Sequence, residues 1–154
     1  MDINFSIMVF EANFWPLYVP DSRFNVPADI LPLYNRFSEY HRREQPGRKL
    51  AWLWNYSRNE IRTNYLNREY TLVTSSYQMA IMLQYNDHDT LTLDELATAT
   101  AIDERALKRA LRRLVNGDVL IKKEKDRYDL NFGNLFPFIS RIMQLSRSHR
   151  FPVE

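Results

Sequence analysis

The first 74 residues alternate between strand-like and helix-like patterns of hydrophobic positions. Residues 3–10 (INFSIMVF) are apolar on both faces, which predicts a strand, and residues 15–19 lie between prolines, which predicts an edge or extended segment. Apolar residues recur at helical spacing from Ile30 to Phe37, so a helix is predicted over residues 29–43.

Three more strand candidates precede the next helix. Residues 49–56 are apolar on both faces, which predicts an interior strand. Residues 60–65 alternate strictly, and a turn at residues 67–68 leads into residues 70–73. These two alternating runs predict a β-hairpin.

From Ser75 onward the hydrophobic period changes from two to 3.6. Residues suited to N-capping open each of three predicted helices, at residues 75–85, 92–99 and 103–116. Two alternating runs, residues 119–123 and 127–132, then predict a second hairpin. Three short helices followed by a hairpin is the order of a winged helix.

These patterns together predict an α+β fold in three parts. Residues 1–74 should form a small mixed or antiparallel sheet with a packed helix, and residues 75–133 a winged-helix domain with a β-hairpin wing. Residues 134–154 should form a short tail, with a helix at about residues 137–146.

The composition restricts the function classes. The chain has 154 residues, no cysteine and a net charge of +2, which excludes a disulfide framework, a thiolate zinc site and a cysteine nucleophile. No apolar run approaches the 18 residues of a membrane helix, and the N-terminus lacks a signal-peptide pattern. We therefore expect a soluble intracellular protein of the cytoplasm or nucleus, without a membrane partner.

No constellation of residues predicts catalysis. Asp87, His88 and Asp89 are of metal-ligating types, but short polar residues are also what a turn between helices needs. One histidine and two carboxylates cannot close a coordination shell. The chain has no glycine-rich phosphate loop and no nucleophile elbow. We expect a protein that is not an enzyme, with no catalytic residue, cofactor or metal.

The helix predicted at residues 103–116 has an apolar stripe and a basic face. The basic residues are Arg105, Lys108, Arg109 and Arg112. A winged helix places this helix in the major groove of DNA, so nucleic-acid binding is one hypothesis. Acidic residues flank the cluster, and no Asn, Gln or Ser accompanies the arginines for base recognition. We therefore favour a solvated or protein-facing surface and keep nucleic acid as the alternative.

Residues 48–54 interleave basic and aromatic residues, as some single-strand nucleic-acid binders do. Both faces of this predicted strand are apolar, so Trp52 and Trp54 should belong to a core or to a protein interface.

Several stretches carry a family resemblance. They are FSIMV at 5–9, FWP at 14–16, GRKLAW at 47–52, SYQMAIML at 76–83 and LTLDEL at 91–96. In this order and spacing they resemble the C-terminal region of cullins, the scaffold subunits of multisubunit RING ubiquitin ligases. The resemblance runs from about residue 3 to residue 132. It implies an α/β domain joined to a winged helix, in agreement with the hydrophobic pattern.

The resemblance also implies a partner. In cullins the α/β sheet accepts the N-terminal strand of a small zinc-binding RING-box protein, which brings the ubiquitin-conjugating enzyme to the scaffold. Such docking is β-augmentation with aromatic anchors. Residues 3–10 and 49–56 are the candidate receiving strands. The candidate packing residues are Phe5, Met8, Trp15, Leu50, Trp52 and Trp54.

Two departures from the family pattern shape the expected function. Cullins are several times longer and carry N-terminal helical repeats that bind substrate adaptors, so we expect a truncated cullin-like protein. Residues 139–144 (ISRIMQ) resemble the motif Ile-Val-Arg-Ile-Met-Lys, whose lysine accepts a ubiquitin-like protein. Gln144 stands where that lysine would be, and an amide cannot replace an amine nucleophile, so we expect the modification to be lost.

The resulting hypothesis is a scaffold fragment of a cullin-RING ubiquitin ligase. It would bind a RING-box protein and contribute to ubiquitin-dependent protein degradation, or compete with full-length cullins in that process. The alternative is a winged-helix protein that binds nucleic acid through the helix at residues 103–116.

Overall fold

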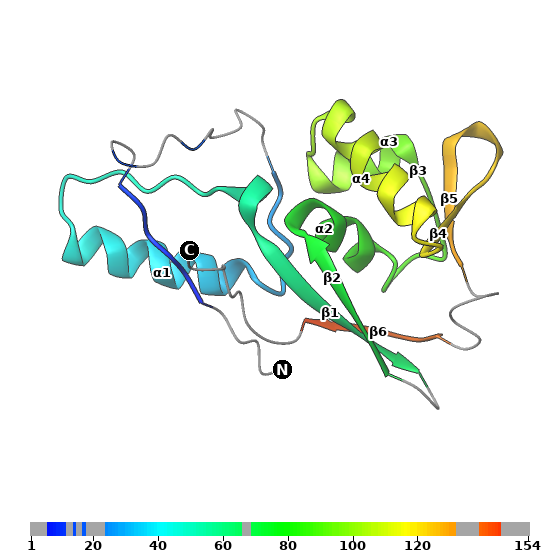
Figure 1. The fold of residues 1–154 in the computed structure, drawn as a ribbon, viewed down its shortest axis with the longest axis horizontal. Helices are drawn as coiled ribbons and strands as arrows, with labels where there is room; N and C mark the ends of the chain where they lie inside the picture. Colours follow the sequence, from blue (N-terminus) through cyan, green and yellow to red (C-terminus); the bar gives the residue numbers. More distant parts are fainter. Residues whose placement is uncertain are drawn as a thin grey trace.

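The computed structural model describes residues 6–11, 14, 17, 24–65, 69–131 and 139–145. Residues 63–65, 69–70 and 139–145 are described by their backbone alone. The described chain has the predicted α+β fold, with helices and two three-stranded antiparallel sheets (Figure 1).

The first sheet has the strand order β2-β1-β6. It contains a hairpin of β1 (Arg58–Tyr65) and β2 (Glu69–Ser75). The two strands pair at seven consecutive positions, in which Arg58 lies opposite Ser75 at one end and Asn64 lies opposite Glu69 at the other. This confirms the hairpin predicted from the alternating runs at residues 60–65 and 70–73. The third strand, β6 (Ile139–Leu145), lies antiparallel along the other edge of β1.

The helix α1 (Leu31–Glu44) confirms the helix predicted at residues 29–43. A proline lies in its first turn, where no intrahelical N–H bond is lost, and its last turn carries His41, Arg42 and Arg43, which favour the negative end of the helix dipole. In Figure 1, α1 lies at the opposite end of the molecule from α3 and α4.

Two predicted elements are wrong in the structure. Residues 49–53 belong to no described strand or helix, and a 3₁₀ turn, η1 (Trp54–Tyr56), follows them. Within the helix predicted at residues 137–146, residues 139–145 instead form β6, because the backbone of this partly apolar segment pairs with the second edge of β1. Residues 6–10 are also outside the described strands, and residues 1–5 and 15–16 lie outside the described residues.

The second half has the element order of a winged helix. Its helices are α2 (Ser76–Gln84), α3 (Leu93–Thr100) and α4 (Glu104–Asn116). Its sheet has the order β3-β5-β4, from β3 (Thr90–Thr92), β5 (Arg127–Leu130) and β4 (Leu120–Lys122), and η2 (Glu124–Asp126) joins β4 to β5. The three-residue strand β3 was not predicted, because so short a run has no detectable period.

Each helix of this half begins where its cap predicts. Ser75 and Gln78 form a capping box, and so do Thr92 and Glu95. The carboxylate of Asp103 accepts hydrogen bonds from two backbone N–H groups in the first turn of α4. These caps satisfy N–H groups that have no partner within their helices.

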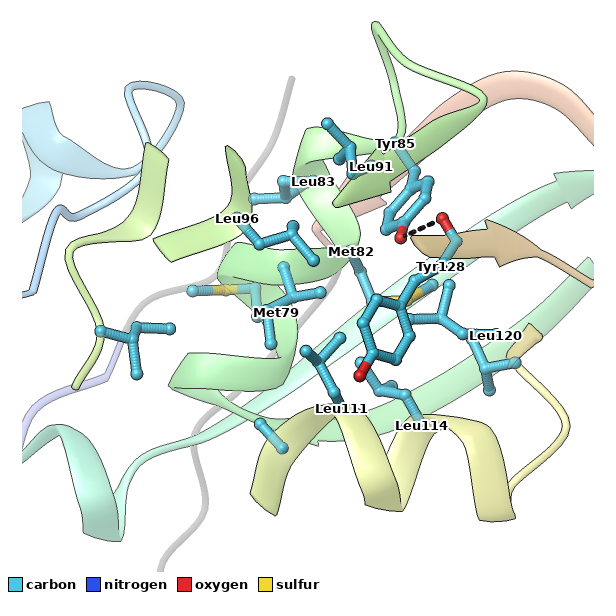
Figure 2. Packing of buried hydrophobic residues seen from close by; sticks show 14 of the residues in the cluster. Met79, Met82, Leu83, Tyr85, Leu91, Leu96, Leu111, Leu114, Leu120 and Tyr128 are labelled. Atoms are coloured by element: carbon cyan, nitrogen blue, oxygen red, sulfur yellow. Dashed lines mark hydrogen bonds between the residues drawn. The ribbon is translucent and has the colours of Figure 1, made fainter. Parts of the chain in front are cut away.

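The hydrophobic core surrounds α2, as Figure 2 shows. Met79 and Ile81 are fully buried, and Met82 is 1% exposed. The helix packs against α3 and α4 on one side and against β1, β2 and η1 on another. One continuous cluster of buried residues therefore joins the first sheet to the winged helix. The domain boundary expected between residues 74 and 75 falls just before the start of α2.

A buried hydrogen bond joins the end of α2 to the wing. The hydroxyl of Tyr85 donates to the backbone carbonyl of Tyr128 at 2.9 Å, drawn as the dashed line in Figure 2. Burial raises the pKa of Tyr85, and the negative charge of Asp129 adds to the effect. The neutral phenol that donates this bond is therefore the stable form at neutral pH.

The substitution Tyr85→Phe should lower the free energy of unfolding by about 1–2 kcal/mol, because it removes this donor from a buried acceptor. Urea denaturation at pH 7 measures the change. The matched control is Tyr56→Phe, since Tyr56 is 42% exposed and should change stability by less than about 0.5 kcal/mol. Equal losses for the two variants would contradict the assigned role.

Candidate functional site

Aromatic side chains from several segments gather beside α1. They pair with ring-centroid distances of 4.6–5.9 Å, in the range where aromatic pairs attract one another. We name this group the aromatic cluster; its members are Phe24, Tyr34, Phe37, Trp52, Trp54 and Tyr77. It fixes the extended segment at residues 49–53 against α1 and the start of α2.

Trp52 and Trp54 are therefore held by their own chain. Trp52 meets the ring of Tyr34 edge-on at 4.6 Å and stacks on Trp54 at 5.7 Å. Both tryptophans are half-buried and keep part of their surface exposed. Tyr34 beneath them is 5% exposed, and burial raises its pKa to about 12.

The backbone of residues 49–52 forms an open edge. No hydrogen bond of the described residues involves the N–H or C=O groups of this segment. Lys49 and Ala51 are exposed, whereas Leu50 and Trp52 are half-buried, so the side chains alternate as in a strand. The segment alternates in exposure as a strand does but has no neighbouring strand among the described elements.

The N-terminal candidates fall into two groups. Met8 is 41% exposed and lies in the segment of residues 6–10, which is at the surface. An ion pair of 2.9 Å between Arg48 and Glu11 links this segment to the start of the open edge, although both side chains are exposed and the pair contributes little energy. Phe5 and Trp15 lie outside the described residues.

Sequence reasoning missed two members of the aromatic cluster. Phe24 precedes the first helix in a stretch without periodicity, and Tyr77 lies in a helix so apolar that its pattern marks no face. Only the approach of segments distant in the chain shows that both rings support Trp54.

The basic face of α4 is at the surface. Arg105, Lys108, Arg109 and Arg112 are all exposed, and the opposite stripe of Leu107, Ala110, Leu111 and Leu114 is buried, as the spacing predicted. Lys108 is paired with Glu104, whose carboxylate raises the pKa of the lysine. In the wing, Lys122 pairs with Asp126 at 2.9 Å. Carboxylates thus neutralise part of the positive surface that a nucleic acid would use.

Gln144 lies in β6, opposite Arg62 of β1. Its backbone is therefore part of the first sheet, and the helix expected around it is absent from the described residues.

Within the described part of the chain, no three His, Cys, Asp or Glu side chains are placed to share a metal ion. Nor does any helix there have the length and apolar character needed to span a membrane.

The comparison with known protein families decides the identity of this fold. A family model described as the cullin alpha+beta domain matches residues 9–141. The chain belongs to the cullin family. The matched region of this cullin-family chain includes the open edge, the aromatic cluster, the winged helix and the start of β6, whereas Met8 and Gln144 lie outside it.

Curated relatives agree with this assignment. The chain is 33% identical to Cullin-1 of Dictyostelium discoideum over 124 residues, which is 79% of this chain and 16% of the relative. It is 34% identical to Cullin-1 of Schizosaccharomyces pombe over 129 residues, or 82% and 17%. It is 31% identical to Cullin-3A of Arabidopsis thaliana over 133 residues, or 84% and 18%. The chain thus spans about a sixth of the length of these relatives.

The buried Tyr34 should make stability sensitive to alkaline pH. Its pKa is 10.0 in the unfolded chain and about 12 in the fold, so stability is complete below pH 10 and falls as pH rises toward 12. Tyr34→Phe should reduce this fall by at most about 2–3 kcal/mol. Denaturation at pH 7 is the reference, because tyrosine is neutral there in both states. Parallel pH curves for the two proteins would contradict the prediction.

The basic face of α4, on which Lys108 is paired with Glu104, should not bind duplex DNA at physiological salt. Fluorescence anisotropy with a labelled duplex, measured at low and at physiological salt, tests this expectation. The opposite outcome is saturable binding that weakens steeply with salt and is lost in Arg109→Ala/Arg112→Ala, which would favour the nucleic-acid alternative.

Proposed function

We propose that this chain is a scaffold region of a cullin-RING ubiquitin ligase. It docks a RING-box protein by accepting an extended strand of that partner. It contributes to ubiquitin-dependent protein degradation in the cytoplasm or nucleus as a non-catalytic subunit, because the partner brings the conjugating enzyme. Membership of the cullin family supports this function, and the open edge at residues 49–52 is the observation that carries the docking mode.

The open edge has the chemistry that strand addition requires. Its N–H and C=O groups are not used by the described fold, so a partner strand gains main-chain hydrogen bonds without breaking any there. An exposed extended edge also invites aggregation, and charged side chains commonly limit it. Arg48 and Lys49 stand at its start and provide that charge.

The aromatic cluster supplies the anchor for the partner. Leu50 and Trp52 keep exposed surface beside the open edge, and Trp54 is stacked on Trp52. Rigid aromatic side chains that are already packed lose little conformational entropy on binding, which is why tryptophan is enriched at interaction hot spots. In this proposal Met8 adds apolar surface from the neighbouring N-terminal segment.

Gln144 bears on regulation. Its side chain offers an amide, which supplies no amine for an isopeptide bond, so we propose that this position is not conjugated to a ubiquitin-like protein.

Proline substitutions at the open edge test the docking. Successive N–H groups of an extended segment point to opposite sides, so either Leu50→Pro or Ala51→Pro removes a donor from the side that faces the partner. We expect that variant to bind a purified RING-box protein at least tenfold more weakly than the parent chain, a change of about 1.4 kcal/mol. Isothermal titration calorimetry measures the affinity.

Leu50→Ala and Ala51→Ser are the matched controls, because they change the same side chains and keep the N–H groups. Circular dichroism checks that each variant is folded. The proposal fails if the parent chain does not bind a RING-box protein. Unchanged affinity in both proline variants would overturn the placement at residues 49–52.

A further inference from the structure

A short segment before α1 joins the winged helix to the aromatic cluster. We name residues 24–26 the strap. After the strap the chain turns into α1, where the backbone carbonyl of Pro27 accepts hydrogen bonds from the N–H groups of Ile30 and Leu31 (Figure 1). The strap therefore lies between the start of α1 and the residues of the winged helix to which it is bonded.

Asn25 attaches the strap to α3 through two hydrogen bonds. Its backbone N–H donates to the carbonyl of Thr100 at 2.8 Å, and its side-chain Nδ2 donates to the carbonyl of Ala99 at 3.1 Å. The last carbonyl groups of a helix have no partner within that helix, and the last turn of α3 carries no basic side chain. Asn25 therefore caps the C-terminus of α3 from a distant part of the chain.

The strap also places Phe24 in the aromatic cluster. The ring centroid of Phe24 lies 5.0 Å from that of Trp54 and 5.4 Å from that of Tyr77. Phe24 directly precedes Asn25, so the two hydrogen bonds of Asn25 limit where this ring can lie. On the other side, Val26 is half-buried against the core. Asn25 is thus the residue of the strap that connects the position of Phe24 to α3.

The open edge depends on side-chain contacts of this kind. No hydrogen bond of the described residues involves the backbone of residues 49–52, and Trp52 and Trp54 are only half-buried. A segment with an unbonded backbone and few buried contacts opens at a low cost in free energy. The loss of one supporting contact therefore changes the fraction of molecules in which this segment has its docking conformation.

We propose that Asn25 is a positioning residue for RING-box docking. By capping α3 it holds Phe24 against Trp54, and Phe24 in turn holds the pair of tryptophans beside the open edge. The inference rests on the proposed function, and it adds that the winged helix orders the docking surface through Asn25.

The substitution Asn25→Asp tests this role in the whole chain. It keeps the shape of the side chain, but the ionised carboxylate has no N–H donor and is repelled by the negative end of α3. We expect the variant to bind a purified RING-box protein about threefold more weakly than the parent chain, because fewer molecules have the docking conformation. Isothermal titration calorimetry at pH 7 measures the affinity, and circular dichroism checks that the variant is folded.

Asn35→Asp is the matched control. Asn35 is exposed on α1, and its substitution changes the net charge equally, so this control should bind like the parent chain. An affinity of Asn25→Asp equal to that of Asn35→Asp would overturn the inference and leave RING-box docking in place. If the parent chain itself binds no RING-box protein, the proposed function fails and this inference fails with it.

A double-mutant cycle tests whether Asn25 acts through Phe24. Phe24→Leu removes the ring from Trp54 and keeps an apolar side chain. Once this ring is absent, adding Asn25→Asp should weaken binding little further, so the effects of the two substitutions should not be additive. Additive losses of affinity would contradict the inference, because Asn25 would then act on a different part of the surface.

Hydrogen–deuterium exchange of the free chain separates positioning from a general loss of stability. The amides of Tyr56 and Ser57 are hydrogen-bonded in η1, and the amide of Asn131 is bonded to Val119 in the winged helix. In Asn25→Asp we expect exchange at η1 to be roughly threefold faster and exchange at Asn131 to be unchanged. Unchanged exchange at η1, or an equal increase at Asn131, would rule out a positioning role.

Discussion

The burial of α2 on all sides is the constraint on which the rest of the fold depends. Residues 79–83 are apolar without interruption and almost completely buried, and no single sheet or helix pair can cover such a helix. The first sheet and η1 cover one part of its surface, and α3 and α4 cover another. The α/β region and the winged helix therefore share one core (Figure 2), and removing either would expose several large hydrophobic side chains of α2 to water.

The same constraint positions the proposed docking surface. Tyr77 in the first turn of α2 contacts Phe24, which contacts Trp54, and Trp54 is stacked on Trp52. The core thus holds the chain straight through residues 49–53 by its side chains rather than by strand pairing. Side-chain packing fixes the conformation of this segment while its hydrogen-bonding groups stay available, which is the preorganisation that strand addition needs.

The second half has the winged-helix fold found in DNA-binding proteins, but acidic residues neutralise part of its basic surface. The third helix of this domain, α4, presents arginines at the surface. Glu104 and Asp126 each form an ion pair with a neighbouring lysine. The buried stripe of α4 packs against α2, so this helix is an integral part of the shared core as well as a surface. Fold alone does not specify nucleic-acid recognition.

The sequence by itself determined the elements whose signals are local. The caps at Ser75, Thr92 and Asp103 and the leucine stripe of α4 depend on residues within a few positions, and the structure confirms them. Only the tertiary structure decided the conformation of two other segments. The patterns of residues 49–56 and 139–145 suit more than one conformation, so the outcome depended on the neighbouring segments: aromatic rings pack against the first, and β1 pairs with the second. The hydrophobic pattern of the sequence indicates which side chains are to be buried. The pairing of the backbone depends instead on which segment, distant in sequence, lies within hydrogen-bonding distance.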